Sequence, residues 1–269
     1  MTLLSASDVS VAFNGHTVVD RVSLALAGGE LVGLIGPNGA GKTTLIRTLA
    51  GVLKPTAGIV HFDGRPLAQL PRRQLARRLA YMAQGADCHW PLTVERVVAL
   101  GRLPHLAPWQ GPGDNDRRAI DQALAAADMT AFAGRRATSL SAGERARALL
   151  ARALAVEPEA LLADEPVAAL DPGHQLDLMT LLKARATAGA AVVVVLHDLS
   201  LAARFCHRLV LLHRGRVLAE GRPEDVLTAE TLAESYGIEA LIGRQDGEPY
   251  VVPWRVVGGR GGAGAPEAG

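Results

Sequence analysis

Nine consecutive residues near the N-terminus have the types and spacing of a phosphate-binding loop, G-x-x-x-x-G-K-[ST]. They are Gly36, Pro37, Asn38, Gly39, Ala40, Gly41, Lys42, Thr43 and Thr44. Glycines let consecutive backbone N–H groups turn toward one oxyanion, and the following helix adds the positive end of its dipole. Lys42 would place a charge at the β- and γ-phosphates, and Thr43 would offer a hydroxyl to Mg²⁺. The loop therefore predicts a site for a nucleoside triphosphate and Mg²⁺.

Two acids and a histidine farther along the chain are candidates to complete this site. Asp164 and Glu165 directly follow an apolar segment. An acid at a strand end can reach the metal, so Asp164 is the predicted Mg²⁺ ligand. Glu165 is the predicted general base for the attacking water. His197 ends another apolar run and can reach the γ-phosphate, because ligands gather at the carboxyl ends of parallel strands. The alternative for His197 is a purely structural role.

Short apolar segments supply the strands that must position these residues. Leu31–Ile35 precedes the loop, and Gly41–Leu53 shows helical periodicity after it. Ala160–Ala163 and Ala191–Leu196 are continuous, apolar and too short for helices, which is typical of buried parallel strands. The order strand, loop, helix predicts an α/β core.

Antiparallel elements are expected at both ends of this core. Ser7–Phe13 and Val18–Ala25 are predicted strands joined by a turn at Asn14-Gly15, and Gly58–Phe62 is a further strand. A closing hairpin is predicted around Arg214-Gly215. The predicted fold class is therefore α/β, with a mixed sheet that includes an N-terminal antiparallel part.

Residues 86–155 differ from the rest and predict an inserted α-helical subdomain. Helical patterns cover Val94–Leu100, Arg117–Ala127 and Gly143–Ala155, and prolines and glycines separate them. The core then comprises about residues 1–85 and 156–225, with a C-terminal extension over 226–257, all in a single domain of residues 1–257. Residues 258–269 are rich in Gly and Ala and are expected to be a disordered tail.

Composition restricts the classes of function. The chain has 269 residues and a net charge of +1, and this near-neutral balance argues against a nucleic-acid partner. The longest apolar run, Ala190–Leu196, is too short to cross a bilayer, and the N-terminus lacks a signal-peptide pattern. Any membrane-spanning part must then belong to another chain. Cys88 and Cys206 match no metal spacing and are expected to be reduced thiols.

Six motifs in order resemble the nucleotide-binding subunit of an ABC transporter. They are the phosphate loop, Gln84, Leu140–Arg147 (LSAGERAR), Asp164-Glu165-Pro166, Ala169-Leu170-Asp171 and His197. The LSAGERAR run distinguishes this family from other ATPases, because many unrelated ATPases share the loop and the acid. The resemblance covers about residues 5–225. It implies a P-loop NTPase core that binds and hydrolyses ATP with Mg²⁺ as cofactor.

The resemblance also assigns roles that the residues alone do not. Gln84 is similar to the residue that touches Mg²⁺ and reports to a membrane partner. Phe13 stands where an aromatic ring stacks on adenine, and Asp171 matches the acid of the D-loop. Four residues match the signature that closes on the γ-phosphate of the opposite subunit: Ser141, Ala142, Gly143 and Glu144.

The signature departs from the usual pattern at Ala142, where a second glycine is common. An alanine forced to positive φ would be strained by roughly 1 kcal/mol. Because Ser141 is a good N-cap, we instead expect an ordinary helix start there. Further departures at Ala83, Ala146 and Val167-Ala168 remove no proposed catalytic side chain.

The signature lies about 100 residues after the loop and would face away from the nucleotide of its own chain. A head-to-tail homodimer would place each signature on the other ATP, giving two sites at one isologous interface. The resemblance further implies integral-membrane permease subunits, an indirect periplasmic or extracellular substrate-binding protein, and a place on the cytoplasmic face of the inner (plasma) membrane.

A second layer of resemblance points to importers of iron–siderophore complexes, haem or cobalamin. Five segments carry it: Leu92–His105, Leu170–Gln175, Leu196–Ala203, Tyr236–Glu239 and Val251–Pro253. Cys88, His89 and Trp90 are interpreted as part of the face that meets the membrane subunit. The alternatives are an ATPase subunit of an exporter and a soluble, non-transport ABC ATPase. The single cassette, the lack of a heptad run and the near-zero charge disfavour the latter.

Overall fold

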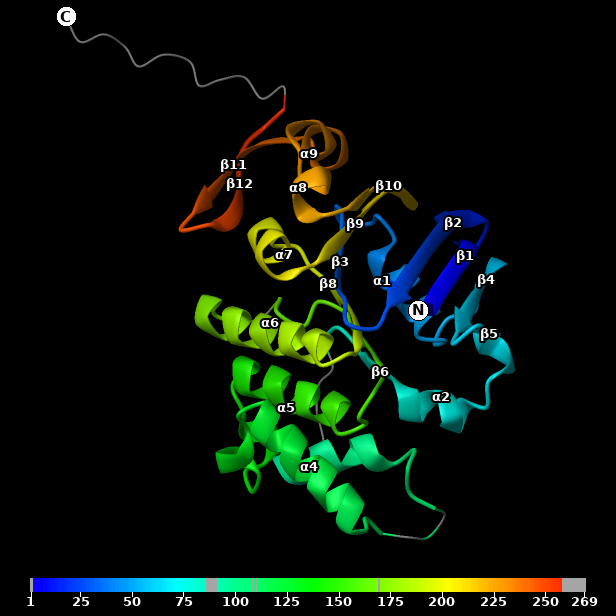
Figure 1. Cartoon of the computed structure of the whole chain (residues 1–269), viewed down its shortest axis with the longest axis vertical. Helices are drawn as coiled ribbons and strands as arrows, with labels where there is room; N and C mark the ends of the chain where they lie inside the picture. The colour runs from blue at the N-terminus through cyan, green and yellow to red at the C-terminus, as the bar shows by residue number, and fades with distance from the viewer. Residues whose placement is uncertain (1, 86–90, 108, 110, 169, 258–269) are drawn as a thin grey trace, which may run out of the picture.

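The structure is a computed structural model that describes residues 2–85, 91–107, 109, 111–168 and 170–257. A four-stranded antiparallel sheet lies on one side of the molecule (Figure 1). Its strands, in spatial order, are β2 (His16–Ala27), β1 (Thr2–Phe13), β4 (Ala57–Phe62) and β5 (Arg65–Pro66). The predicted strands are present, and β1 and β2 are longer than expected. They join through the predicted Asn14-Gly15 turn, where both residues have positive φ.

A second, six-stranded sheet carries the predicted parallel strands. Its spatial order is β10 (Arg216–Gly221), β9 (Arg208–His213), β3 (Leu31–Ile35), β8 (Ala191–Val195), β7 (Ala160–Ala163) and β6 (Leu79–Met82). All neighbours are parallel except β10 and β9, which form the predicted closing hairpin. The α/β fold with a mixed sheet is confirmed. The antiparallel N-terminal strands form their own sheet beside it.

Strand β8 shows how two hydrophobic cores share this sheet. Val193 and Val195 pack with the antiparallel sheet, whereas Val192 and Val194 pack with the helices on the other face. Successive side chains point to opposite faces of a strand, so a strand that is buried on both sides must be apolar throughout. The rigid sheet fixes the positions of the residues that follow each strand.

The helix after the phosphate loop, α1, covers Lys42–Leu49. The prediction that it extends to Leu53 is wrong. Gly51 adopts a left-handed conformation (φ 69°), and a Cβ there would lie 2.6 Å from the Leu67 side chain. This left-handed residue ends the helix and turns the chain toward β4.

The remaining helices flank the six-stranded sheet or form the lower part of the molecule (Figure 1). The lower part contains α3 (Val94–Ala99), α4 (Asp114–Ala126) and α5 (Ala142–Leu154). Between it and the terminal hairpin lie α6 (Pro172–Thr187) and α7 (Leu199–Phe205). Short 3-10 turns lie at Leu67–Gln69, Leu100–Arg102, Thr130–Phe132 and Ala137–Ser139. No helix of the described residues is long and apolar enough to span a membrane.

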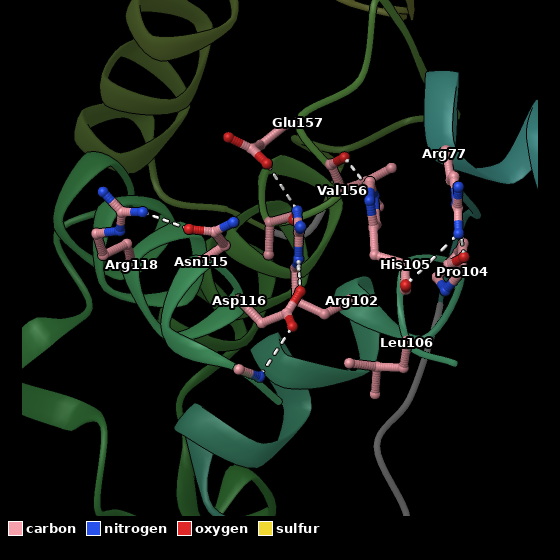
Figure 2. Close-up of polar contacts among 12 residues, drawn as sticks. Arg77, Arg102, Pro104, His105, Leu106, Asn115, Asp116, Arg118, Val156 and Glu157 are labelled. Carbon is pink, nitrogen blue, oxygen red and sulfur yellow. Dashed lines mark hydrogen bonds and ion pairs between the residues drawn. The ribbon is translucent and has the colours of Figure 1, made fainter. Parts of the chain in front are cut away.

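A buried arginine ties the helical part together (Figure 2). Arg102 is only 5% exposed. Its guanidinium donates to Asp116 Oδ1 (2.9 Å), Glu157 Oε2 (2.8 Å) and the Ala155 carbonyl (2.8 Å). The other oxygen of Asp116 accepts from the N–H of Gly113, which precedes α4. One cation therefore joins the start of α4 to the end of α5.

Helix α2 (Arg72–Arg78) connects this part to the core. Arg73 and Arg77 both donate through Nε to the Pro104 carbonyl, at 2.9 and 2.8 Å. Arg73 also donates to the Leu106 carbonyl. Figure 2 shows Arg77 above this turn of the chain. Because β6 follows α2 directly, these bonds link the helical part to the edge strand of the central sheet.

The C-terminal extension has its own structure. It contains α8 (Pro223–Val226), α9 (Ala229–Tyr236) and the hairpin of β11 (Ile238–Gln245) and β12 (Glu248–Val256). The hairpin packs on α7, and Ser200 both donates to the Val251 carbonyl and accepts from its N–H, each at 3.0 Å. The predicted disordered tail, residues 258–269, lies outside the described residues.

Candidate functional site

The phosphate loop joins β3 to α1, the context that its motif requires. Two of its glycines are dictated by geometry. Gly36 has φ 143°, and a Cβ there would lie 2.2 Å from the Leu212 carbonyl oxygen. Gly41, at the N-cap of α1, has φ 99°, and a Cβ would lie 2.7 Å from the Val18 carbonyl. A side chain at either position would displace backbone, so the loop conformation depends on glycine.

Lys42 lies at the first position of α1 and is 5% exposed. Its ammonium group donates to the carbonyls of Gly36 (2.7 Å) and Pro37 (2.9 Å). Burial lowers the pKa of Lys42, and the charges of Glu165 and Asp164 oppose that shift. A cation with these partners is held at the loop, where an anionic ligand would compensate its desolvation.

A cavity of about 180 Å³ opens over the loop. Its lining is Val18, Asn38, Gly39, Ala40, Gly41, Lys42, Thr43, Thr44 and Glu165. Most of the predicted phosphate-binding residues therefore share one cavity with the predicted base. Phe13, the predicted adenine platform, lies at the end of β1 and is 47% exposed.

Asp164 follows β7 and is fully buried. Its Oδ1 accepts from the Thr43 hydroxyl at 3.2 Å, and its Oδ2 accepts from the Tyr81 hydroxyl at 3.2 Å. Burial raises the pKa of the carboxyl, and these two hydrogen bonds counteract it. The structure thus brings together two of the three predicted metal ligands, Asp164 from a strand end and Thr43 from a helix start.

Glu165 lies between the two other candidate residues of the site. Gln84 donates from Nε2 to Glu165 Oε2 at 2.6 Å, and His197 Nε2 lies 2.6 Å from Glu165 Oε1. Glu165 has positive φ (51°), an uncommon conformation for a non-glycine residue. Three residues from three different strand ends therefore meet at the carboxylate beside the phosphate loop.

The oxygen groups of Thr43 and Asp164 suit Mg²⁺, which usually takes few protein ligands and completes its shell with phosphate and water. The described residues contain no group of three or more His, Cys, Asp and Glu side chains that could hold a metal ion by themselves. Gln84 binds Glu165 here rather than Asp164, so its contact with Mg²⁺ stays a prediction.

The predicted signature lies at the start of α5. Ser141 is the N-cap: its Oγ accepts from the N–H of Glu144 (3.2 Å), whose carboxylate accepts from the N–H of Ser141 (2.8 Å). Ala142 is the first residue of the helix, which confirms the expected ordinary helix start. Gly143 lies against His174 of α6, since a Cβ there would be 3.2 Å from its Nδ1.

The predicted D-loop acid and the predicted cysteine and permease-facing residues lie away from the phosphate loop in sequence. Asp171 is the N-cap residue of α6, and its side chain is 89% exposed, with His174 Nδ1 at 3.8 Å. Cys88, His89 and Trp90 lie outside the described residues. Cys206 is a buried free thiol whose pKa burial raises to about 12, as expected for an unreactive cysteine.

Tyr81 is the site residue that the sequence analysis missed. It lies on β6, beside the β7 residues that lead to Asp164. The available signal was its position three residues before Gln84, because neighbouring parallel strands end at the same edge of a sheet.

The profile of the ABC transporter family matches residues 19–168. The chain belongs to this family and is one of its ATP-binding, ATP-hydrolysing subunits. The hemin import ATP-binding protein HmuV of Nocardia farcinica is 48% identical over 240 residues, which cover 88% of this chain and 83% of that protein. The protein of the same name from Pseudomonas aeruginosa is 43% identical over 257 residues, which cover 93% of this chain and 99% of that protein.

Solved structures show the same fold. A metal-chelate type ABC transporter in an inward-facing conformation superposes with a TM-score of 0.83 over 95% of this chain and 98% of that one, at 24% identity. A dimeric bacterial ABC transporter cassette matches with a TM-score of 0.73 over 82% and 99%, at 29% identity. The predicted P-loop NTPase fold is therefore confirmed.

Proposed function

We propose that this chain hydrolyses ATP to energise a membrane importer for haem or a related iron chelate. The Glu165 carboxylate carries the proposal, because Gln84 and His197 hold it at 2.6 Å each beside the phosphate loop. The names of the relatives, hemin import ATP-binding proteins, support the direction and class of cargo. The proposed Mg²⁺ would be held by Thr43, Asp164 and Gln84, and would neutralise phosphate charge.

The chemistry follows from the residues around the cavity. The N–H groups of Gly36–Thr44 and the Lys42 ammonium bind the phosphates, and Phe13 stacks on the adenine. Glu165 takes a proton from a water molecule as the oxygen of that water attacks the γ-phosphorus. The bond from that phosphorus to the bridging oxygen breaks, and ADP and phosphate leave. His197, hydrogen-bonded to Glu165, orients the base and reaches the γ-phosphate.

The proposed working form is a head-to-tail homodimer. Ser141 is exposed, so its hydroxyl is accessible to a second chain, and the dimeric cassette among the solved relatives supports this arrangement. In it, Ser141, Ala142, Gly143 and Glu144 close on the ATP of the partner, with Asp171 at the interface. Loss of the γ-phosphate removes contacts made from both sides, so the dimer opens.

We place the dimer on permease subunits at the cytoplasmic face of the inner membrane. The single domain of residues 1–257 would transmit its opening through the helical part, residues 86–155. The face around Cys88, His89 and Trp90 would meet the permease. A substrate-binding protein outside the membrane would deliver the cargo.

A crosslink tests the geometry of the dimer. Ser141→Cys and Asn38→Cys are combined in a chain that also carries Cys88→Ser and Cys206→Ser. We expect an intermolecular disulfide that forms efficiently only with ATP, seen on a non-reducing gel. Each single-cysteine chain is the control. Links that ignore ATP, or that form only within one chain, contradict the head-to-tail arrangement.

Growth on a single iron source tests the cargo. A strain of the source organism that lacks this gene should fail to grow with hemin as its only iron source. The wild-type gene should restore growth, and a Lys42→Ala gene should not. Normal growth on hemin without the gene, with loss of growth on an iron–siderophore complex instead, would assign a different cargo.

A further inference from the structure

Tyr81 contacts the buried carboxylate of the ATP site from the side opposite the phosphate loop. It lies on β6, paired in parallel with Leu162 of β7, two residues before Asp164. Its hydroxyl donates to Asp164 Oδ2, while Thr43 donates to Oδ1, each at 3.2 Å. The two oxygens are thus held by hydroxyl groups from two different elements.

The surroundings give this contact its weight. Asp164 is fully buried, so each of its oxygens needs a hydrogen-bond donor or a cation. The side chain of Tyr81, and to a smaller extent the charge of Asp164, raise the pKa of Arg47 in the last turn of α1. Tyr81 therefore holds the Asp164 oxygen that Thr43 does not bind.

We infer that Tyr81 is a positioning residue that orients the Asp164 carboxylate toward the divalent cation of bound ATP. This inference rests on the proposed metal role of Asp164. With Oδ2 held by the phenol, the carboxylate cannot rotate freely, and Oδ1 stays directed at Thr43, the other oxygen ligand. Mg²⁺ demands near-ideal octahedral geometry, so it is sensitive to the orientation of its few protein ligands.

A positioning role for Tyr81 affects nucleotide binding with Mg²⁺ but not without it, whereas a packing role would change both affinities together. The Tyr81 hydroxyl donates to Asp164, and neither residue is part of the lining of the phosphate cavity. Removing this hydroxyl should therefore weaken the contribution of the metal to nucleotide binding. It should leave binding without metal unchanged.

The test is equilibrium binding of a fluorescent, non-hydrolysable ATP analogue to the full-length chain, with excess Mg²⁺ and with EDTA. The ratio of the two dissociation constants measures the contribution of the metal. Tyr81→Phe keeps the ring and loses the hydroxyl. We expect this ratio to fall about tenfold, the scale of a lost outer contact to a metal ligand. The dissociation constant in EDTA should stay within about twofold of wild type.

Three further variants make the result decisive. Tyr250→Phe removes a hydroxyl from the C-terminal hairpin and should change neither constant. Tyr81→Leu also lacks the hydroxyl, so it should lower the ratio as Tyr81→Phe does, and it decides the question if Tyr81→Phe does not fold. Asp164→Asn should lower the ratio most.

The outcomes distinguish the inference from the proposed function. If Asp164→Asn loses the metal effect while Tyr81→Phe keeps it, Tyr81 is a packing residue and the inference is wrong. Equal weakening with Mg²⁺ and with EDTA in Tyr81→Phe also overturns it. If Asp164→Asn itself keeps the full metal effect, the metal assignment in the proposed function fails first.

Discussion

The two halves of the proposed ATP site are built in different ways. The half around the phosphate loop comes from strand ends of one rigid sheet, and its side chains already contact each other: Thr43 binds Asp164, and Gln84 and His197 hold Glu165. The signature half is the first turn of one helix. The Ser141 hydroxyl there is used to cap its own helix.

The difference shows which parts of a site a single chain can prearrange. Parallel strands converge their carboxyl ends at one edge, so residues far apart in sequence meet without a ligand. A helix start offers exposed groups and no partner of its own beyond the cap. In the proposed dimer, the signature acts on a nucleotide only when the phosphate loop of a second chain approaches it.

The largest effect is expected from a substitution in the phosphate-loop half of the site. Glu165→Gln keeps the size of the side chain and its bond to Gln84 or His197 but removes the base. We expect ATP hydrolysis to fall about 10²- to 10⁴-fold, while the dissociation constant for ATP stays near wild type. Steady-state phosphate release and equilibrium binding measure the two. Parental hydrolysis in a folded Glu165→Gln chain would rule out Glu165 as the base.

A change in the second half should separate binding from chemistry. Ser141→Arg places a bulky cation where the partner nucleotide must approach, so hydrolysis should fall about 100-fold or more, like the loss of a positioned group. Binding of ATP to the monomer should be unchanged, because the phosphate loop is intact. Ser141→Thr keeps the hydroxyl and the cap and should stay active. Weakened ATP binding in Ser141→Arg would place the signature within its own site.

The sequence predicted the first half in more detail than the second. The loop pattern, the acids after an apolar run and the strand-end histidine each had a mechanical reason, and the parallel sheet brings Glu165 and His197 together as those reasons require. The bond from Gln84 to Glu165 was not foreseen, since it depends on rotamers that no spacing encodes.

Three structural details had no periodic signal in the sequence. Helix α1 stops at Leu49 because Gly51 turns the chain through a left-handed conformation. Tyr81 lies on a four-residue strand, too short for any pattern to mark. The hairpin β11–β12 has exposed apolar residues in both strands, such as Leu241 and Trp254. Its sequence therefore lacks the regular alternation of apolar and polar residues that marks a half-buried strand.

The helical part that carries the second half should depend on one buried cation. Arg102→Met removes the donor of Asp116, Glu157 and the Ala155 carbonyl. We expect the free energy of unfolding to fall by about 2 kcal/mol, because the carboxylates left behind are only partly buried. Denaturant titration followed by circular dichroism measures it. Arg117→Met, which removes an exposed partner of Asp114, is the matched control and should change little.

If Arg102→Met is as stable as the control, the buried contacts of Arg102 add little to the stability of the helical part. If it is less stable, hydrogen exchange should show faster opening in α4 and α5 than in β3 and β8. That pattern would sharpen the contrast between a rigid sheet and a separately held helical part.

The smallest expected effect concerns the sheet that holds the first half. Arg208 binds Glu30 in a bidentate pair and holds the pKa of Glu30 below its ordinary value of 4.5. A lowered folded-state pKa means that this stabilisation is present above about pH 4.5 and is lost as the pH falls through the folded-state pKa. Glu30→Gln should therefore cost about 1 kcal/mol at pH 7 and less at pH 3.

Thermal or urea unfolding at the two pH values tests this dependence. Glu239→Gln breaks an ion pair with Arg255 that is half-exposed on the C-terminal hairpin, and it is the matched control. A Glu30→Gln deficit that is the same at pH 3 and pH 7 would mean that packing, not the charge, is responsible.

The attachment of the C-terminal hairpin has a genetic consequence. Val251 is bonded twice to Ser200, which lies three residues after His197. A nonsense codon anywhere between Gly237 and Val251 would spare every predicted ATP-site residue and still remove the strand that is hydrogen-bonded to Ser200 in α7. Such alleles should yield chains that keep every predicted ATP-site residue but have reduced ATP turnover. The codons needed for full activity therefore extend well beyond the codon for His197, the last predicted residue of the ATP site.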